Sequence, residues 1–159
     1  MSAIRQASAL TENGEGMTEI QQSALLPYSA QAMFELINDI ESYPQFMEGC
    51  LGAKVLERTD ALVTARLDLG KAGLKYSFTT RNTLQAPESM QMELVEGPFK
   101  SFSARWHFTP LKEDACKASL FMQFEFESGL LDVVLRKLFD SSCRSLVNAV
   151  CKRADELYG

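Results

Sequence analysis

The stretch Ala118-Ser-Leu-Phe-Met-Gln-Phe-Glu-Phe126 places an apolar side chain at every second position, while the proline-free segment from Gly129 to Gly159 that follows has apolar residues at helical spacing. Alternation with a period of two is typical of a half-buried β-strand. The second pattern predicts a long helix with Ser128 as its N-cap. The junction of the two patterns predicts a sheet that ends where a long covering helix begins.

The same alternation precedes this stretch. It predicts strands around residues 63–69, 74–81, 90–94 and 102–108, separated by turn signals such as Gly70-Lys-Ala-Gly73 and Gly97-Pro98. An earlier strand is predicted at Thr18–Leu26. Sequential hairpins with one apolar face predict an antiparallel meander.

A short helix is predicted between the first strand and the meander. Ser29 is its expected N-cap, and its apolar face carries Met33, Leu36, Ile37 and Ile40. The helix should stop near Tyr43, because Pro44 disfavours a helical conformation in the residue before it. The apolar residues Phe46 and Met47 follow this break, so the loop either covers a core or borders an apolar cavity.

The final helix needs a partner for its apolar side, and the sheet supplies one. The predicted apolar side carries Leu131, Val134, Leu135, Leu138, Leu146 and Ala149. A meander covered by a long terminal helix predicts an α+β fold. Residues 1–17 show no sustained period and are predicted to be a mobile tail, and residues 18–159 to form a single domain.

Composition limits the classes of function. The formal net charge is −5 and there is no basic run, so DNA is not an expected partner. No secretory signal is recognisable, which predicts a cytoplasmic protein. The four cysteines form no Cys-x-x-Cys pair and are interpreted as thiols rather than zinc ligands.

Catalytic chemistry has few candidates. The single histidine, His107, alternates away from the apolar face and is expected to point outward. Glu125 and Glu127 have the same outward parity, so they are expected on a solvated face rather than as a general acid and base. We therefore expect no catalytic residues, no metal site and no enzyme.

The inward positions are large, and they leave two interpretations open. Either they fill the core or they surround a pocket, since the final helix presents small residues, Ser142, Ser145 and Ala149, near its middle. Thr80 and Asn82 share the inward parity and would orient the head of a mostly apolar ligand.

Several short motifs carry a resemblance to a known family. They are Leu26-Pro-Tyr-Ser29, Met33-Phe-Glu-Leu-Ile-Asn-Asp39, Ser42-Tyr-Pro-Gln-Phe46, Gly49-Cys50, Phe78-Thr-Thr-Arg-Asn82, Gly97-Pro-Phe-Lys100, Trp106-His-Phe-Thr-Pro110 and Phe124-Glu-Phe126. With the order of elements, they make residues 18–158 resemble the START-like polyketide cyclase/dehydrase superfamily, within it the family of coenzyme Q-binding proteins and RatA ribosome-association toxins.

The resemblance implies a helix-grip (START-like, Bet v 1-like) fold, in which a curved antiparallel sheet wraps around the C-terminal helix. It implies a tunnel for lipophilic molecules, with ubiquinone or a similar quinone as a non-covalent ligand, transient membrane contact for ligand exchange, and a role in respiratory quinone function. Pattern and resemblance together predict a cavity lined by Tyr43, Pro44, Phe46, Met47, Tyr76, Phe78, Asn82, Met92, Phe102, Trp106, Phe108, Met122, Phe124, Leu138, Ser142, Ser145 and Ala149.

Two other functions follow from the same resemblance. One is a ribosome-association toxin that binds the large ribosomal subunit and blocks subunit joining, with Lys100, Arg105, Lys112 and Lys117 as candidate basic residues. The other is a polyketide cyclase or aromatase, which would need an acid or base in the cavity. The sequence does not decide between the quinone-binding function and the ribosome-association toxin.

Overall fold

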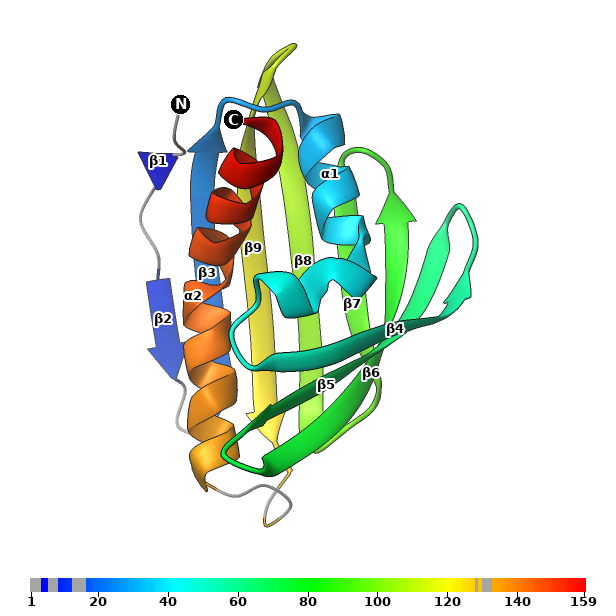
Figure 1. Ribbon diagram of the computed structural model, residues 1–159, viewed down its shortest axis with the longest axis vertical. Helices are drawn as coiled ribbons and strands as arrows, with labels where there is room; N and C mark the ends of the chain where they lie inside the picture. The colour runs from blue at the N-terminus through cyan, green and yellow to red at the C-terminus, as the bar shows by residue number, and fades with distance from the viewer. Residues whose placement is uncertain (1–3, 6–8, 13–16, 128, 130–132) are drawn as a thin grey trace.

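The computed structural model describes residues 4–5, 9–12, 17–127, 129 and 133–159. Within these residues one antiparallel sheet has the strand order β1-β3-β9-β8-β7-β6-β5-β4, and β2 also pairs with β3 (Figure 1). The strands are β1 (Ile4–Arg5), β2 (Ala9–Glu12), β3 (Thr18–Leu26), β4 (Cys50–Arg58), β5 (Leu62–Lys71), β6 (Leu74–Gln85), β7 (Ser89–Glu96), β8 (Phe99–Lys112) and β9 (Ala115–Phe126).

The predicted meander is confirmed, because β5 to β9 pair in chain order and β3 adds to the free side of β9. Strand β4 was not predicted. Its side chains do not alternate in burial, its register shifts near Gly52 and Glu57, and Leu51 and Leu56 are exposed. As an edge strand that packs on the segment before it, β4 lacks the period of two that revealed the others.

The N-terminal residues were predicted to form a mobile tail. Ile4–Arg5 and Ala9–Glu12 instead pair with β3 as short strands. For the rest of the segment, and for its mobility, the expectation stays a prediction.

The first helix, α1 (Ala30–Asn38), begins as predicted. The Ala32 amide donates a hydrogen bond of 3.1 Å to the Ser29 side chain. The α-helix ends at Asn38, earlier than predicted, because Asp39 leaves the helical region. A 3₁₀ helix, η1 (Ile40–Gln45), follows, and it contains Pro44. The chain between α1 and β4 is therefore a compact turn rather than an open loop.

The long helix α2 (Val133–Tyr158) lies in the concave side of the sheet (Figure 1). It contacts β3 near one edge of the sheet and also β5 and β6 near the other edge. A helix reaches strands that far apart in the strand order only if the sheet curls around it. The predicted α+β helix-grip architecture is thus confirmed, while the predicted cap Ser128 lies outside the described residues and Gly129 lies in a turn.

Polar contacts join the middle and the C-terminal end of α2 to neighbouring segments. The Tyr28 hydroxyl donates to Asp155, the Gln22 amide donates to the Arg144 carbonyl at 2.8 Å, and the Tyr158 hydroxyl donates to the Ala32 carbonyl. Neither α1 nor α2 has the length and hydropathy that a membrane-crossing helix requires, within the described part of the chain.

Candidate ligand-binding cavity

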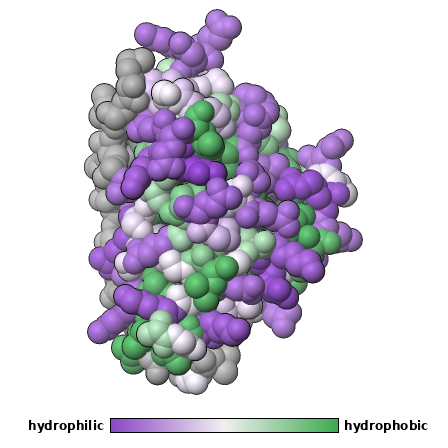
Figure 2. All heavy atoms as spheres, viewed as in Figure 1, coloured by the Kyte–Doolittle hydropathy of each residue, from purple (hydrophilic) through white to green (hydrophobic). Residues whose placement is uncertain are grey.

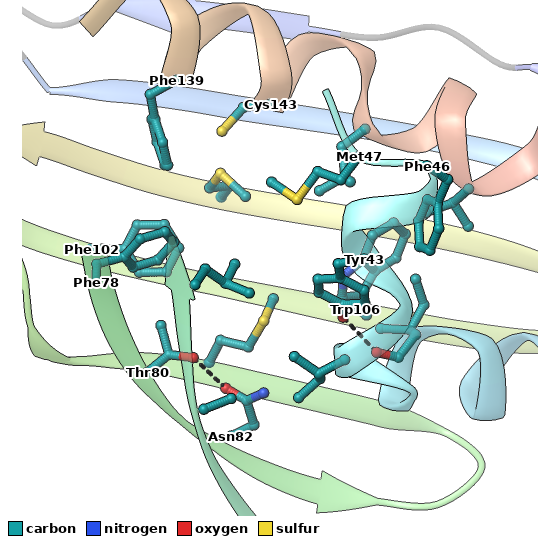
Figure 3. A pocket seen from close by; sticks show the side chains of 18 residues that line it. Tyr43, Phe46, Met47, Phe78, Thr80, Asn82, Phe102, Trp106, Phe139 and Cys143 are labelled. Carbon is teal, nitrogen blue, oxygen red and sulfur yellow. Dashed lines mark hydrogen bonds between the residues drawn. The ribbon is translucent and has the colours of Figure 1, made fainter. Parts of the chain in front are cut away.

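An apolar cavity of about 60 Å³ lies between α2, η1 and the concave face of the sheet (Figure 3). Side chains from β5, β6, β7, β8 and β9 form its floor, and α1, η1, the loop after η1 and α2 supply the rest. The lining residues are Ile37, Ile40, Tyr43, Phe46, Met47, Ala65, Leu67, Phe78, Thr80, Asn82, Met92, Phe102, Trp106, Met122, Phe139, Cys143, Leu146 and Val150.

Aromatic rings close one end of this cavity. Phe139 of α2 meets Phe78 at 5.9 Å and Phe102 at 6.3 Å between ring centroids, both edge to face. Phe78 and Phe102 are themselves 5.4 Å apart. Edge-to-face contacts of this kind are favourable beyond the area that they bury, so they stabilise this end of the cavity.

The 3₁₀ segment closes the other end. The Tyr43 ring lies edge-on to Phe46 at 5.6 Å, and the Tyr43 hydroxyl donates to the Ile37 carbonyl. Burial raises the pKa of Tyr43 above its usual range, so the phenol stays protonated. Pro44 points away from the cavity, because it is exposed to solvent.

Phe46 separates the cavity from the surface. It lines the cavity and also a shallow groove between η1 and α2. The Arg153 guanidinium lies 5.7 Å from the centre of the Phe46 ring, and its Nη2 donates a 2.9 Å hydrogen bond to the Gln45 side chain. Arg153 therefore holds the aromatic ring that covers this end of the cavity.

The loop after η1 is also fixed to α2. The Ser142 hydroxyl donates to the Glu48 carbonyl at 2.6 Å, while Ser141 and Ser145 donate to the Glu48 carboxylate. Gly49 follows with φ of +75°, and a Cβ there would meet a Leu138 methyl at 2.9 Å. The positive φ favours glycine at this position, and the absence of a Cβ leaves room for the Leu138 side chain. The face that α2 and η1 form is largely hydrophilic, with separate apolar areas (Figure 2).

The cavity contains one polar pair. The Thr80 hydroxyl donates to Asn82 Oδ1 at 2.9 Å, and Asn82 is 2% exposed (Figure 3). Among the described residues, Asn82 Nδ2 has no hydrogen-bond partner. This nitrogen is not fully enclosed by protein atoms, so its N–H groups are open to the cavity that Asn82 lines.

No carboxylate, histidine, lysine or arginine belongs to the described lining. His107 and Glu125 lie on the outer face as predicted: His107 Nε2 is 3.4 Å from Glu88, and Glu125 is 3.9 Å from Lys100 Nζ. Burial raises the pKa of the Cys143 thiol well above its ordinary value, so it lines the cavity as a neutral group.

The structure brings part of the predicted site together. The predicted residues that line the cavity are Tyr43, Phe46, Met47, Phe78, Asn82, Met92, Phe102, Trp106 and Met122. Those that do not line it are Pro44, Tyr76, Phe108, Phe124, Leu138, Ser142, Ser145 and Ala149. That the first group binds a ligand stays a prediction.

The differences on α2 share one cause. The sequence placed Ser142, Ser145 and Ala149 over the sheet, but Ser142 bonds to the loop at Glu48, and Ser145 and Ala149 line the outer groove. Val134, predicted on the apolar side, is 44% exposed. The helix is rotated relative to the predicted wheel, because its apolar residues occur on more than one side and do not fix the rotation.

The other non-lining residues pack elsewhere. Phe108 stacks on Trp106 at 6.0 Å, Phe124 contacts Phe139 at 4.8 Å, and Leu138 rests on Gly49. Tyr76 lies beside the cavity wall, where its buried hydroxyl has no hydrogen-bond partner among the described residues. Its pKa is raised above the usual range by burial.

Sequence reasoning missed lining residues on α1, η1, β5 and α2. On α2 they are Phe139, Cys143, Leu146 and Val150. These positions recur at intervals of four, three and four, which is the spacing of one helix face, so this signal was present in the sequence. Ala65 and Leu67 lie in the strand predicted around residues 63–69, and Leu146 lies on the predicted apolar side of the helix, but none of the three was assigned to the site.

Comparisons with known proteins agree with this architecture. Residues 26–151 match the model of a family described as polyketide cyclase / dehydrase and lipid transport. Two solved structures are similar in fold: a START superfamily protein from Mycobacterium smegmatis (TM-score 0.72, 22% identity, 87% of this chain and 98% of that one) and the Zhui aromatase/cyclase from Streptomyces sp. R1128 (TM-score 0.74, 18% identity, 87% and 94%).

Curated relatives also cover most of the chain. The persistence and stress-resistance toxin PasT of Escherichia coli O6:H1 is 44% identical over 142 residues, which is 89% of this chain and 90% of PasT. The ribosome association toxin RatA of Escherichia coli K12 is 43% identical with the same coverage. The mitochondrial coenzyme Q-binding protein COQ10 homolog B of Xenopus laevis is 24% identical over 150 residues, which is 92% of this chain and 62% of that protein.

The family match spans most of the chain, and it contains strands β4 to β9, most of α2 and every residue that lines the cavity. Relatives above 40% identity extend over almost nine-tenths of the sequence. This chain therefore belongs to the START-like polyketide cyclase/dehydrase and lipid transport family.

Proposed function

We propose that this protein associates with ribosomes, as a protein of the RatA type that binds the large subunit and blocks subunit joining. The observation that carries the proposal is the 43–44% identity to RatA and PasT over 89% of the chain. The expected quinone carrier has weaker support from relatives, because the coenzyme Q-binding protein is only 24% identical. Ribosome association would place the protein in the cytoplasm.

The outer face of the sheet is the surface that we assign to this contact. The concave face is covered by α2, whereas the outer face exposes Arg81 and Arg105 on β6 and β8. Neither side chain forms an ion pair with a described residue. Cations without a protein partner are suited to phosphate oxygens of RNA.

The basic residues first considered do not form one patch. Lys100 lies within 3.9 Å of Glu125, and Lys112 stands at the opposite end of β8. At about 3.3 Å per residue these two positions are roughly 40 Å apart. Arg105, near the middle of the strand, is the better candidate.

The test is sedimentation through sucrose gradients after overexpression and after adding purified protein to ribosomes. We expect the protein to sediment with the large subunit and the fraction of joined ribosomes to fall. Arg105→Glu should weaken this effect, whereas Lys112→Glu, which changes the net charge equally, should not. Unchanged ribosome profiles together with no co-sedimentation would reject the proposal.

A second proposal concerns the cavity: it holds a hydrophobic ligand. The apolar lining and the family's description as lipid transport support this proposal. The volume of about 60 Å³ is smaller than the roughly 300 to 1,000 Å³ of sites for drug-sized ligands, so a long tail would have to displace Phe46 toward the groove. A quinone is one candidate, supported by the similarity to the coenzyme Q-binding protein.

Organic extraction of the gently purified protein, followed by mass spectrometry, tests the second proposal. We expect a lipophilic molecule at a fixed ratio to protein, and less of it when Arg153 and Phe46 are both replaced by alanine. A protein that is empty and takes up no added lipophile would refute it. Polyketide cyclisation is not proposed, because the described cavity lining carries no carboxylate or histidine to act as acid or base.

A further inference from the structure

We propose that Asn82 selects the ligand of the cavity, and that this ligand is a neutral, mostly apolar molecule with a hydrogen-bond acceptor such as a ketone or quinone carbonyl. The inference rests on the proposal that the cavity holds a hydrophobic ligand, and it adds the ligand's chemical class and the residue that recognises it.

The first observation is the state of the Asn82 amide. Its Oδ1 accepts the hydrogen bond from Thr80, which fixes the orientation of the amide plane. Its Nδ2 group carries two N–H donors that have no partner among the described residues, although the side chain is 2% exposed and lines the cavity. Buried donors are normally satisfied, so this one indicates an acceptor that a bound molecule supplies.

The second observation is what the neighbouring polar groups offer. The Tyr43 hydroxyl donates to the Ile37 carbonyl and the Thr80 hydroxyl donates to Asn82, so these hydrogens are occupied. The Trp106 indole also lines the cavity, and its N–H makes no hydrogen bond with a described residue. The N–H groups of Asn82 and Trp106 are therefore the donors that remain available in the cavity, and they call for a hydrogen-bond acceptor on the ligand.

The third observation is charge. The described lining holds no carboxylate and no cationic side chain, and its other members are almost all apolar. An ion transferred into such surroundings loses its hydration without gaining a counter-ion. Carboxylates, phosphates and amines are thus excluded from the interior, and the acceptor belongs to a neutral group.

The place of Asn82 fixes the orientation of the ligand. Figure 3 shows Asn82 and Thr80 on one side of the cavity and Phe46 on the other. Phe46 also borders the surface groove. We therefore expect the acceptor to lie at Asn82 and the apolar body to run toward Phe46, past Met92 and Met122, whose flexible side chains adapt to its shape.

Titration of the ¹⁵N-labelled protein with three probes of similar size tests the inference. Acetophenone has an apolar ring and a carbonyl, ethylbenzene lacks the carbonyl, and benzoate is charged at pH 7. A neutral hydrogen bond contributes a factor of roughly 2 to 13 in affinity, so acetophenone should bind more tightly than ethylbenzene by that factor. The Asn82 side-chain amide resonances should shift downfield, as in a newly formed hydrogen bond, with acetophenone and not with ethylbenzene, and benzoate should not bind.

Asn82→Leu keeps the size of the side chain and removes the donors. It should abolish the preference for acetophenone while ethylbenzene still binds. Thr83→Leu, on the exposed side of the same strand, should leave both affinities unchanged and serves as the matched control. The resonance shift in the wild-type protein needs no variant, so the test holds even if Asn82→Leu folds poorly.

Equal affinities for acetophenone and ethylbenzene in the wild-type protein would overturn this inference and leave the cavity proposal standing. Benzoate binding as tightly as acetophenone would also overturn it. Binding of none of the three probes would refute the cavity proposal itself, and this inference with it.

Discussion

Ala65 offers a direct measurement of the cavity, because it is 3% exposed, lies in the middle of β5 and lines the empty space. Ala65→Val adds two methyl groups there, and valine suits a strand. Empty volume in a core costs about 24 cal/mol per Å³, so about 60 Å³ corresponds to about 1.4 kcal/mol. We expect Ala65→Val to raise the free energy of unfolding by up to that amount, or the melting temperature by about 3 to 6 °C.

Urea and thermal denaturation of the ligand-free protein measure this change. Ala118→Val is the matched control: Ala118 is 1% exposed on the same face of the sheet, between Ala24 and Phe108, and does not line the cavity. Extra methyl groups in a filled core cost about 1 to 3 kcal/mol, so this variant should be destabilised. Opposite signs for the two alanines would identify the cavity as real empty space.

The same variant separates the two proposed functions. Filling the cavity should weaken the binding of a hydrophobic probe, while ribosome association should be unchanged, because Ala65 is buried and not part of the outer surface. If Ala65→Val is as destabilising as Ala118→Val, the interior is already filled and the reasoning about the cavity fails.

Other predictions concern the groups around the cavity. Arg153→Ala removes the hydrogen bond to Gln45 and the cation–π contact with Phe46, so urea denaturation should show a free energy of unfolding lower by about 1 to 2.5 kcal/mol. An unchanged free energy of unfolding would mean that Arg153 does not hold the ring. Tyr76→Phe deletes a hydroxyl without a described partner, so the unfolding free energy should stay equal or rise by up to about 1 kcal/mol, and a clear loss would reveal a hidden partner. Burial raises the pKa of Cys50 and Cys116 from 9 to about 11, so the folded protein keeps both thiols protonated at pH values where the unfolded chain loses the protons. Their contribution to the free energy of unfolding is therefore fully present below pH 9 and decreases as the pH rises toward 11. All four buried thiols should therefore resist Ellman's reagent at pH 8 and react only after denaturation; rapid reaction of the native protein would contradict this.

The sequence predicted the elements wherever its pattern was regular. Strands β3 and β5 to β9 were recognised from alternation, and the cap at Ser29 from its side-chain chemistry. The irregular edge strand β4 was missed, because bulges and exposed leucines interrupt its period. The outward position of His107 also followed from alternation alone.

The residues that line the cavity were predicted well on the strands and poorly on the final helix, while their role in binding stays a prediction. A strand has two faces, so the parity that buries Trp106 also turned Asn82 and Met92 inward. A helix can rotate continuously about its axis, and α2 has apolar residues on more than one side. Its rotation was decided by Phe139 packing among the rings of the sheet and by Ser142 bonding to the loop at Glu48.

The sequence by itself determined the α+β class, the family and the two faces of most strands, because these depend on local periods and short motifs. Only the tertiary structure decided that empty space remains under α2, that Phe46 covers it and that the N–H groups of Asn82 lie there without a partner among the described residues. The physical reason is that the empty volume in a core and the hydrogen bonds of a buried side chain depend on how segments distant in the chain pack together. The periodicity of a single segment carries no information about that packing.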